Sequence, residues 1–256
     1  MPTTGKFIER HGLYGPEKIE AAERSKKLVE QHDVELIRIV WPDQHGLLRG
    51  KALTRAAYFA ALESGNEITM APFFFDPANA IVLNPFSTDG GFAVEGLGGS
   101  PNITMVPDPD TFQLLPWAPK TAVVFADLYM SNGALFPLAP RTILRNSLAK
   151  LAERNYKLVA GIEMEWYLTR IVDDLLGKCS LGAPGTPADP PQVAPVARGY
   201  NYLLVDHLDE IDDALTPIRD SVLAMGLPLR SFDDEWAPSQ VETTFDILEG
   251  LQAADS

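Results

Sequence analysis

The sequence predicts an α+β fold in two regions, and three observations support this. The first half of the chain has an amphipathic helix pattern followed by segments in which apolar and polar residues alternate. The second half has another strong helix pattern that leads into further strand patterns. The length of 256 residues, 46% of them hydrophobic, suffices for one large domain or two modest ones.

The helices of the first region follow from charge, capping and proline signals. Residues 1–15 have no clear pattern and predict a flexible tail. Residues 16–33 predict a charged amphipathic helix, with Pro16 at a first-turn position. Thr54 and Gly65 are residue types that begin and end helices, so a second helix is expected between them.

The strands of the first region follow from alternation. The segment 34–41, "VELIRIVW", predicts a strand, and 42–53 predicts a turn and a returning strand. Shorter strands are expected at residues 80–84, 102–108 and 121–129. The glycine-rich segment 84–101 predicts a long loop, and loops of that length are often functional.

The second region begins with a predicted helix over 137–156, where leucines recur at helical spacing. Residues 156–170, "YKLVAGIEMEWYLTR", predict a buried strand. Residues 170–198 are rich in proline and predict an exposed, mobile insertion. Residues 206–226 predict a helix that bends near Pro217.

Acidic residues interrupt segments that otherwise resemble core. Glu163 and Glu165 are two apart and therefore share one strand face. In "RSFDDEWAPSQVETTF", the same rule places Asp233 with Glu235 before Pro238, and Glu242 with Gln240 and Thr244 after it. If both segments are neighbours in one sheet, four carboxylates converge: those of Glu163, Glu165, Glu235 and Glu242.

Converging carboxylates stay ionised only when a cation lies between them. Ligation by oxygen alone suits Mg²⁺ or Mn²⁺, which usually also bind substrate phosphates, so the pattern indicates phosphoryl chemistry. Two other interpretations remain. A single Glu-x-Glu pair is more often a solvated acidic strand face, and paired carboxylates also occur in hydrolases.

Composition restricts the partners and the compartment. The net charge is −14 and the pI is near 4.6, which disfavours nucleic acid and anionic membranes as partners. The segment "MPTTGKFIER" has no signal-peptide core, and no apolar run has the length of a membrane span. Cys179 is the single cysteine, so no internal disulfide forms, and a cytoplasmic location is expected.

Two motifs resemble the signatures of a known family. "GIEMEWYL", residues 161–168, resembles the first signature of glutamine synthetases, and "EWAPSQVE", residues 235–242, resembles their second. The spacing of the two motifs, with a proline-rich insertion between them, also fits. Further likeness occurs in three upstream segments, so that the resemblance covers most of residues 34–253: 34–53, 102–117 and 140–163.

The resemblance implies a fold, a reaction and an assembly. Residues 16–135 would form a β-grasp-like domain, and 136–256 the first part of a catalytic domain with a curved antiparallel sheet. The implied enzyme is an ATP- and divalent-metal-dependent ligase. ATP phosphorylates the γ-carboxylate of glutamate, and ammonia or an organic amine attacks the acyl phosphate. The intact protein would be a homo-oligomer of stacked hexameric rings.

The resemblance also assigns residues. Glu165, Glu235 and Glu242 match ligands of the metal on the substrate side, and Glu163 matches a ligand of the metal that holds the ATP phosphates. Asp89 is the candidate counterpart of an acidic loop residue that binds and deprotonates ammonium.

Departures from the family pattern modify these expectations. Ser239 replaces a usual glycine, Asp233 and Asp234 stand where many relatives have histidines, and the loop around Asp89 is differently spaced. An organic amine is therefore expected as the acceptor substrate at least as strongly as ammonia. The family's catalytic domain continues well beyond the length present, so the chain alone is expected to be incomplete and inactive. The alternative is a non-catalytic glutamine synthetase-like protein with a structural or regulatory role.

Overall fold

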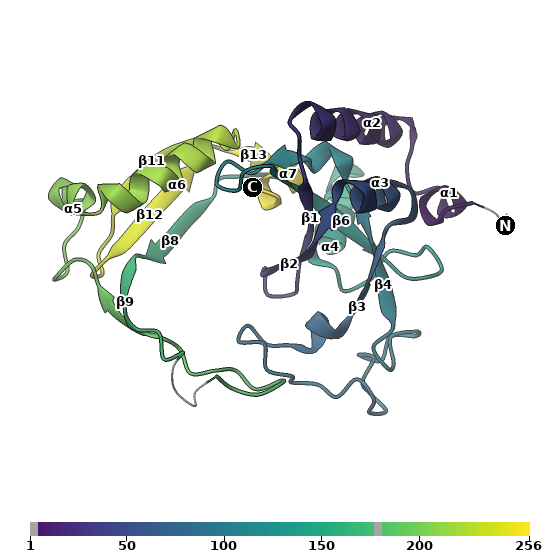
Figure 1. The fold of residues 1–256 in the computed structure, drawn as a ribbon, viewed down its shortest axis with the longest axis horizontal. Helices are drawn as coiled ribbons and strands as arrows, with labels where there is room; N and C mark the ends of the chain where they lie inside the picture. Colours follow the sequence, from purple (N-terminus) through teal and green to yellow (C-terminus); the bar gives the residue numbers. More distant parts are fainter. Residues whose placement is uncertain (1–4, 177–180) are drawn as a thin grey trace. The chain divides into compact units, whose positions relative to one another are not determined.

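The structure, a computed structural model, describes residues 5–176 and 181–256, and Cys179 lies outside the described residues. The chain divides into two compact units, residues 1–150 and 151–256 (Figure 1). Both units combine helices with sheets, which confirms the α+β class. Within the described part of the chain, no helix has the length and apolar character needed to cross a membrane.

The first unit contains a mixed sheet in the order β2-β1-β6-β4-β3, with β5 paired to β6. Strands β1 and β6 are parallel, and the other neighbours are antiparallel. The strands are β1 (Leu36–Pro42), β2 (Leu48–Thr54), β3 (Asn66–Thr69), β4 (Asn102–Pro107), β5 (Gln113–Leu114) and β6 (Thr121–Tyr129). The helices are α1 (Phe7–His11), α2 (Pro16–Gln31), α3 (Arg55–Ser64), α4 (Pro140–Ala152) and the 3-10 turns η1 (Ala71–Phe74) and η2 (Pro109–Thr111). That this unit is a β-grasp stays a prediction.

The predicted helix–strand–strand–helix order at the start of this unit is confirmed. The Thr54 hydroxyl accepts a hydrogen bond from the Ala57 amide at the start of α3, as an N-cap does. Gly65 ends the helix at φ +66°, and a Cβ there would lie 2.4 Å from Thr104 Cγ2. Between β1 and β2, the buried Asp43 carboxylate accepts hydrogen bonds from the amides of His45 and Leu47, which shapes the turn.

Two predictions in this unit are wrong. Part of the expected tail is helix α1, because Ile8 is buried and Lys6 forms an ion pair with Glu63. The expected strand at 80–84 is reduced to one bridge between Phe75 and Ile81. There the Asp76 carboxylate holds a turn by accepting from the amides of Ala78 and Ala80, which leaves the apolar side chains that follow exposed and without a partner strand.

Helix α4 is shorter than the predicted 137–156, and its start belongs to the first unit. Arg141 is buried between two carboxylates, with Nη2 2.7 Å from Asp108 Oδ2 and Nη1 2.7 Å from Asp127 Oδ1. Lys18 on α2 also pairs with Asp108, and Arg145 with Asp127. This network explains why the start of α4 belongs to the compact unit that ends at residue 150.

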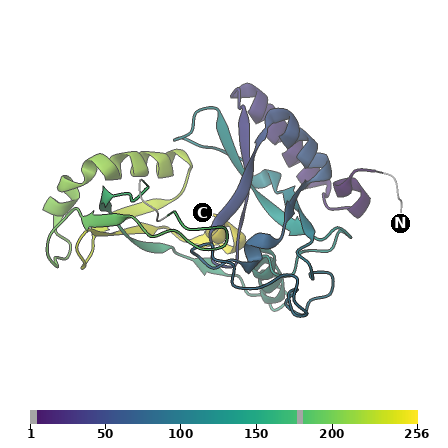
Figure 2. The ribbon, with the colours of Figure 1, turned by 60° about the horizontal axis from the view of Figure 1, so that its bottom comes forward.

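The second unit is built on an antiparallel sheet in the order β11-β12-β8. Figure 2 shows helices of this unit lying along one side of the sheet. Two further strand pairs flank it, β13 with β7 and β10 with β9. The strands are β7 (Val159–Ala160), β8 (Glu163–Tyr167), β9 (Thr169–Asp173), β10 (Gln192–Pro195), β11 (Leu229–Asp234), β12 (Gln240–Phe245) and β13 (Leu248–Glu249). The helices are α5 (Val205–Glu210), α6 (Asp212–Ala224) and α7 (Gly250–Ala254).

Three expectations for this unit need correction. The single strand over 156–170 is divided into β7, β8 and the start of β9. The ends of the 170–198 insertion pair with each other as β9 and β10, so a long-range pairing forms where composition indicated only a loop. The predicted helix over 206–226 is interrupted at Ile211, whose backbone leaves the helical region, while Pro217 lies inside α6.

One face of the β11-β12-β8 sheet packs against α5 and α6. Ile211, Leu215 and Val241 form its buried centre. Trp166 packs against this cluster, and its indole N–H donates to the Thr243 hydroxyl at 2.9 Å. Because side chains alternate along each strand, the glutamates of β8 and β12 lie on the opposite face.

Candidate metal-binding site

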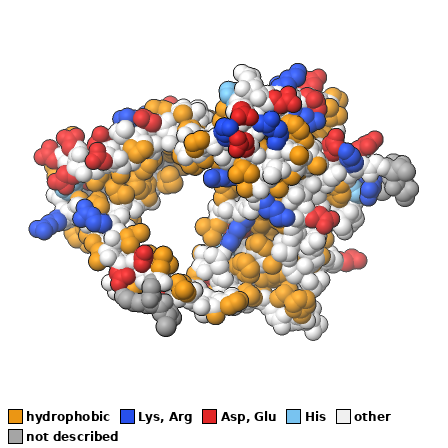
Figure 3. All heavy atoms as spheres, in the orientation of Figure 1, with side chains coloured by type: hydrophobic (Ala, Val, Ile, Leu, Met, Phe, Trp, Pro, Cys, Tyr) orange, Lys and Arg blue, Asp and Glu red, His pale blue; other side chains and the backbone are white. Residues whose placement is uncertain are grey.

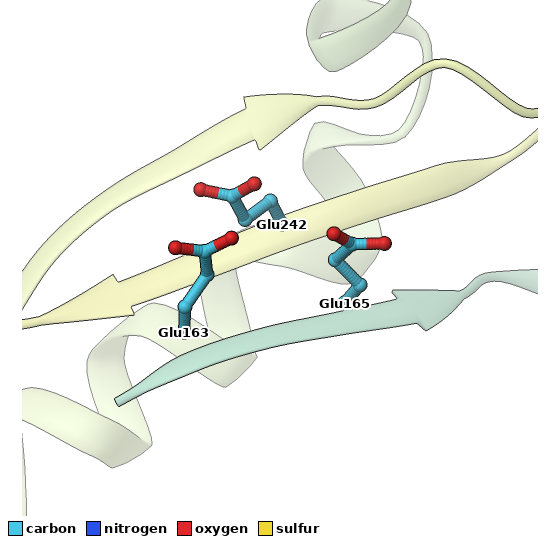
Figure 4. A group of neighbouring side chains, drawn as sticks. All are labelled: Glu163, Glu165 and Glu242. Carbon is cyan, nitrogen blue, oxygen red and sulfur yellow. The ribbon is translucent and has the colours of Figure 1, made fainter. Parts of the chain in front are cut away.

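Three of the four predicted glutamates lie together on the open face of the sheet. Glu165 is directly opposite Glu242 in the antiparallel register, and Glu163 is opposite Thr244. Figure 4 shows Glu163 and Glu165 rising from β8 and Glu242 from β12, all on one side of the sheet. One carboxylate oxygen of each lies within 4.8 Å of the others, a spacing at which a single cation reaches all three.

Glu235 lies beside this group, just past the end of β11. Its backbone amide donates to the Gln240 carbonyl at 3.0 Å, and its carboxylate accepts from the Trp236 amide at 3.0 Å. Its negative charge is close enough to Glu242 to raise the pKa of that carboxyl. Glu235 therefore borders the three-glutamate cluster of Glu163, Glu165 and Glu242.

The cluster perturbs its most enclosed member. Loss of surrounding water raises the pKa of Glu242 above its ordinary value, and the negative charges of Glu163 and Glu235 raise it further. A cation bound among these oxygens would remove the repulsion. The donor set therefore favours occupation by a hard divalent ion.

Neighbouring polar groups orient the cluster through hydrogen bonds that the pattern within one strand does not predict. The Gln240 side-chain amide donates to Glu165 Oε2 at 2.6 Å. The Ser231 hydroxyl donates to Asp233 Oδ2 at 2.6 Å, and Asp233 stands directly opposite Glu242. Alternation along each strand does place Ser231, Asp233 and Gln240 on the same face as the glutamates.

The two adjacent aspartates that replace family histidines have different surroundings. Asp233 lies on the face of the glutamates, whereas Asp234 is buried on the reverse face. Asp234 Oδ2 accepts from the Leu204 amide at 3.1 Å, and Asp234 Oδ1 lies 3.2 Å from His207 Nδ1. Asp234 therefore fixes the start of α5 and takes no direct part in the cluster.

Ser239, where the family usually has glycine, has a left-handed backbone with φ +65°. A side chain at this φ costs free energy, but the buried hydroxyl accepts two hydrogen bonds, from the amides of Val196 at 2.6 Å and Ala197 at 2.9 Å. The Ser239 carbonyl accepts from the Leu168 amide at 3.0 Å. Ser239 thus joins the β9–β10 pair to the strand that carries Glu242.

We expect Ser239→Ala to destabilise the protein by about 2 kcal/mol, because it leaves two enclosed amides without an acceptor. Ser239→Gly should be less damaging by about 1 kcal/mol, since glycine removes the left-handed backbone cost. Urea unfolding monitored by tryptophan fluorescence measures both. Ser221→Ala, which removes an exposed hydroxyl on α6, is the control. Equal effects of the changes at Ser239 and Ser221 would contradict this role.

Asp89, the candidate catalytic residue, lies within the glycine-rich segment 84–101. It is an exposed residue of the first unit, in a turn where its carbonyl accepts from the Phe92 amide at 3.1 Å. The three-glutamate cluster belongs to the second unit. The role of Asp89 therefore stays a prediction.

A cavity of about 550 Å³ adjoins the cluster in the second unit. Its lining residues include Glu163, Ser231, Thr244 and Arg230. A volume of this size accommodates a small ligand. The guanidinium of Arg230 forms an ion pair with Asp246, with Nη1 3.5 Å from Oδ1.

Comparison with known proteins gives a consistent family assignment. The profile of the glutamine synthetase catalytic domain matches residues 137–256. A gamma-glutamylanilide synthase from Acinetobacter sp. is 49% identical over 253 residues, which are 98% of this chain and 51% of that protein. A glutamate–isopropylamine ligase from Pseudomonas sp. is 31% identical, over 90% of this chain and 47% of that protein. The chain thus spans about half the length of the curated relatives it matches.

Solved structures show the same fold. A complex of GmaS with ADP superposes with a TM-score of 0.67 at 22% identity, over 90% of this chain and 45% of that one. A structure described as a novel glutamine synthase homologue superposes with a TM-score of 0.63 at 20% identity, over 87% of this chain and 46% of that one.

Proposed function

The chain belongs to the glutamine synthetase family, and from this we propose that it forms the metal-binding part of an ATP-dependent ligase that joins the γ-carboxylate of glutamate to an amine. The observation that carries the proposal is the convergence of Glu163, Glu165 and Glu242 on one sheet face. These residues come from the two family signatures, which lie far apart in the sequence.

The residues present fit a divalent cation. Glu163, Glu165 and Glu242 would hold Mg²⁺ or Mn²⁺, with Glu235 beside them and waters completing the coordination. Such an ion, when bound, neutralises negative charge on phosphate oxygens. Gln240 holds the Glu165 carboxylate in place, and the cavity beside Glu163 leaves room for an anionic group of a substrate.

We propose that the acceptor is an organic amine and not ammonia. Two relatives named for organic amines support this, the gamma-glutamylanilide synthase and the glutamate–isopropylamine ligase. The altered spacing of the loop that contains Asp89 also agrees with a change of acceptor. As in the family, the protein would act as a homo-oligomer, which light scattering on the purified protein tests.

We expect aniline and isopropylamine to support turnover roughly tenfold faster than ammonia, a difference of about 1.4 kcal/mol in the barrier. Residues 1–256, joined to the C-terminal half of the Acinetobacter relative, should release phosphate from ATP when glutamate and an amine are present. Glu165→Gln in the same protein should abolish the release and serves as the control. Equal or faster turnover with ammonia would contradict the choice of acceptor.

A further inference from the structure

A cavity of about 420 Å³ in the first unit is lined by residues of both edge strands of the mixed sheet, β2 and β3. The Lys51 ammonium on β2 donates to the Glu67 carbonyl on β3 at 2.7 Å and to the Asn66 side-chain oxygen at 3.1 Å. The sheet therefore curls until its two edges meet at the cavity. Figure 3 shows Lys and Arg side chains beside hydrophobic ones in this part of the first unit. The three-glutamate cluster belongs to the second unit, so the cavity is a separate candidate site.

Arg49 lines the cavity and has hydrogen-bond donors that its neighbours leave unused. Its Nε donates to Asp43 Oδ2 at 2.8 Å, and its Nη1 donates to Asn79 Oδ1 at 2.6 Å. Its Nη2 is enclosed, yet among residues 5–176 and 181–256 it has no hydrogen-bond partner. An enclosed N–H group without an acceptor costs free energy, so a ligand that supplies an acceptor to this nitrogen would be favoured.

Lys51 supplies a second donor on the same side of β2. Arg49 and Lys51 are two residues apart, so both side chains lie on one face of the strand. An ammonium group has three N–H bonds, and the two hydrogen bonds to described residues of β3 leave the third for a ligand.

The charges around the cavity limit what the ligand can be. The Asp43 carboxylate, which balances the charge of Arg49, is fully buried at the β1–β2 turn and does not line the cavity. Glu67 is the acidic residue of the lining, and its carboxylate accepts from the Asn102 side-chain amide at 3.3 Å. Glu67 would repel a dianion such as phosphate, whereas a ligand with one negative charge and two acceptor atoms matches the donors of Arg49 and Lys51.

We propose that this cavity binds a small organic monocarboxylate. One carboxylate oxygen would accept from Arg49 Nη2 and the other from Lys51 Nζ. Trp41, Ile68 and Pro72 also line the cavity and would contact the apolar stem of the ligand. Because Lys51 already joins the two edge strands, a bound carboxylate should hold them together more firmly and stabilise the first unit. The inference is independent of the ligase reaction.

Titration of trifluorobutyrate with the 256-residue chain, followed by fluorine NMR, measures the binding. A chelator removes divalent cations, so that the carboxylate cannot bind through a metal. Lys51→Met and Arg49→Lys should each weaken binding on the order of tenfold, the effect of losing one charge-assisted hydrogen bond. Arg49→Lys keeps the positive charge beside Asp43 but removes Nη2. Arg38→Met, at an exposed arginine of the neighbouring strand β1, is the matched control and should leave binding unchanged.

Competing ligands and the lysine variant decide the outcome. Saturable binding that Lys51→Met weakens, and that neither inorganic phosphate nor butylamine displaces, would support the inference. Absence of binding, or binding that Lys51→Met leaves unchanged, would overturn it. Displacement by phosphate at equal concentration would show a general anion site and overturn the choice of a monocarboxylate. Because Lys51 is exposed, Lys51→Met keeps the test decisive even where Arg49→Lys fails to fold.

Discussion

Replacing both Glu165 and Glu242 by glutamine should remove Mn²⁺ binding, with affinity falling on the order of 100-fold or more. Glutamine keeps the size of each side chain but removes two of the three negative charges that face one another in the cluster, and charge count sets the affinity of such sites. Calorimetric titration of Mn²⁺ into the chain, or electron paramagnetic resonance of free Mn²⁺, measures the change.

Glu210→Gln provides the control, because Glu210 is an exposed glutamate of the same unit on α5. It should leave Mn²⁺ affinity unchanged. Retained affinity in the double variant would show that the cation binds elsewhere, and the metal site would then be misplaced.

The pH dependence of Mn²⁺ binding follows from the raised pKa of Glu242. Only the deprotonated carboxylate is a ligand, so binding weakens as the pH falls through this pKa. Because the pKa is raised, the loss should begin at a higher pH than for an ordinary glutamate. Glu163→Gln removes one of the charges that raise the pKa, so the midpoint of the residual binding should move to lower pH. An unchanged midpoint would contradict the coupling of the two carboxylates.

Replacing Arg141 by methionine should destabilise the first unit by about 3–5 kcal/mol, as expected when one partner of a buried ion network is removed. Arg141 is almost fully buried, and its loss leaves Asp108 and Asp127 with fewer positive partners. Urea unfolding at neutral pH measures the effect. Arg154→Met, at an exposed position just after α4, should change stability by less than about 0.5 kcal/mol.

At acidic pH, the difference in stability between Arg141→Met and the unchanged protein should become smaller. Burial alone would raise the pKa of Asp108, but hydrogen bonds from Lys18 and Arg141 outweigh it and lower the pKa. Its contribution to stability is therefore complete above the unfolded pKa of about 3.9 and is lost as the pH falls through the lower folded value. A difference between Arg141→Met and the unchanged protein that stays constant into this range would contradict the assignment.

Local patterns predicted the cluster because its geometry depends on alternation. Glu163 and Glu165 share a face in any strand, and Glu242 joins them once β12 pairs with β8 in register. Alternation also grouped Glu235 with Asp233, but Glu235 follows the last residue of β11, so its position depends on the turn at Ser239 and not on the strand. The bond from Gln240 to Glu165 joins two strands, so neither strand alone predicted it.

The secondary-structure elements that the sequence predicted wrongly depend on contacts between distant parts of the chain, or on the absence of such contacts. Helix α1 is held by the burial of Ile8 and by an ion pair between Lys6 and the distant Glu63. The β9–β10 pair forms between segments that a proline-rich stretch separates. At residues 80–84 a strand was predicted from an apolar sequence, but the segment forms only one bridge, between Ile81 and Phe75.

Asp233 and Asp234 are consecutive, yet a mutational library should show that substitutions at the two positions affect different properties of the protein. Substitutions at Asp234 break the attachment of α5 and should reduce the amount of folded protein, whatever ligand is present. The Asp233 side chain lies on the face of the three-glutamate cluster, so variants at this position should fold normally. These variants should differ in which cation they bind most tightly. An engineer who wishes to retune this site can therefore diversify position 233 freely while holding its neighbour constant.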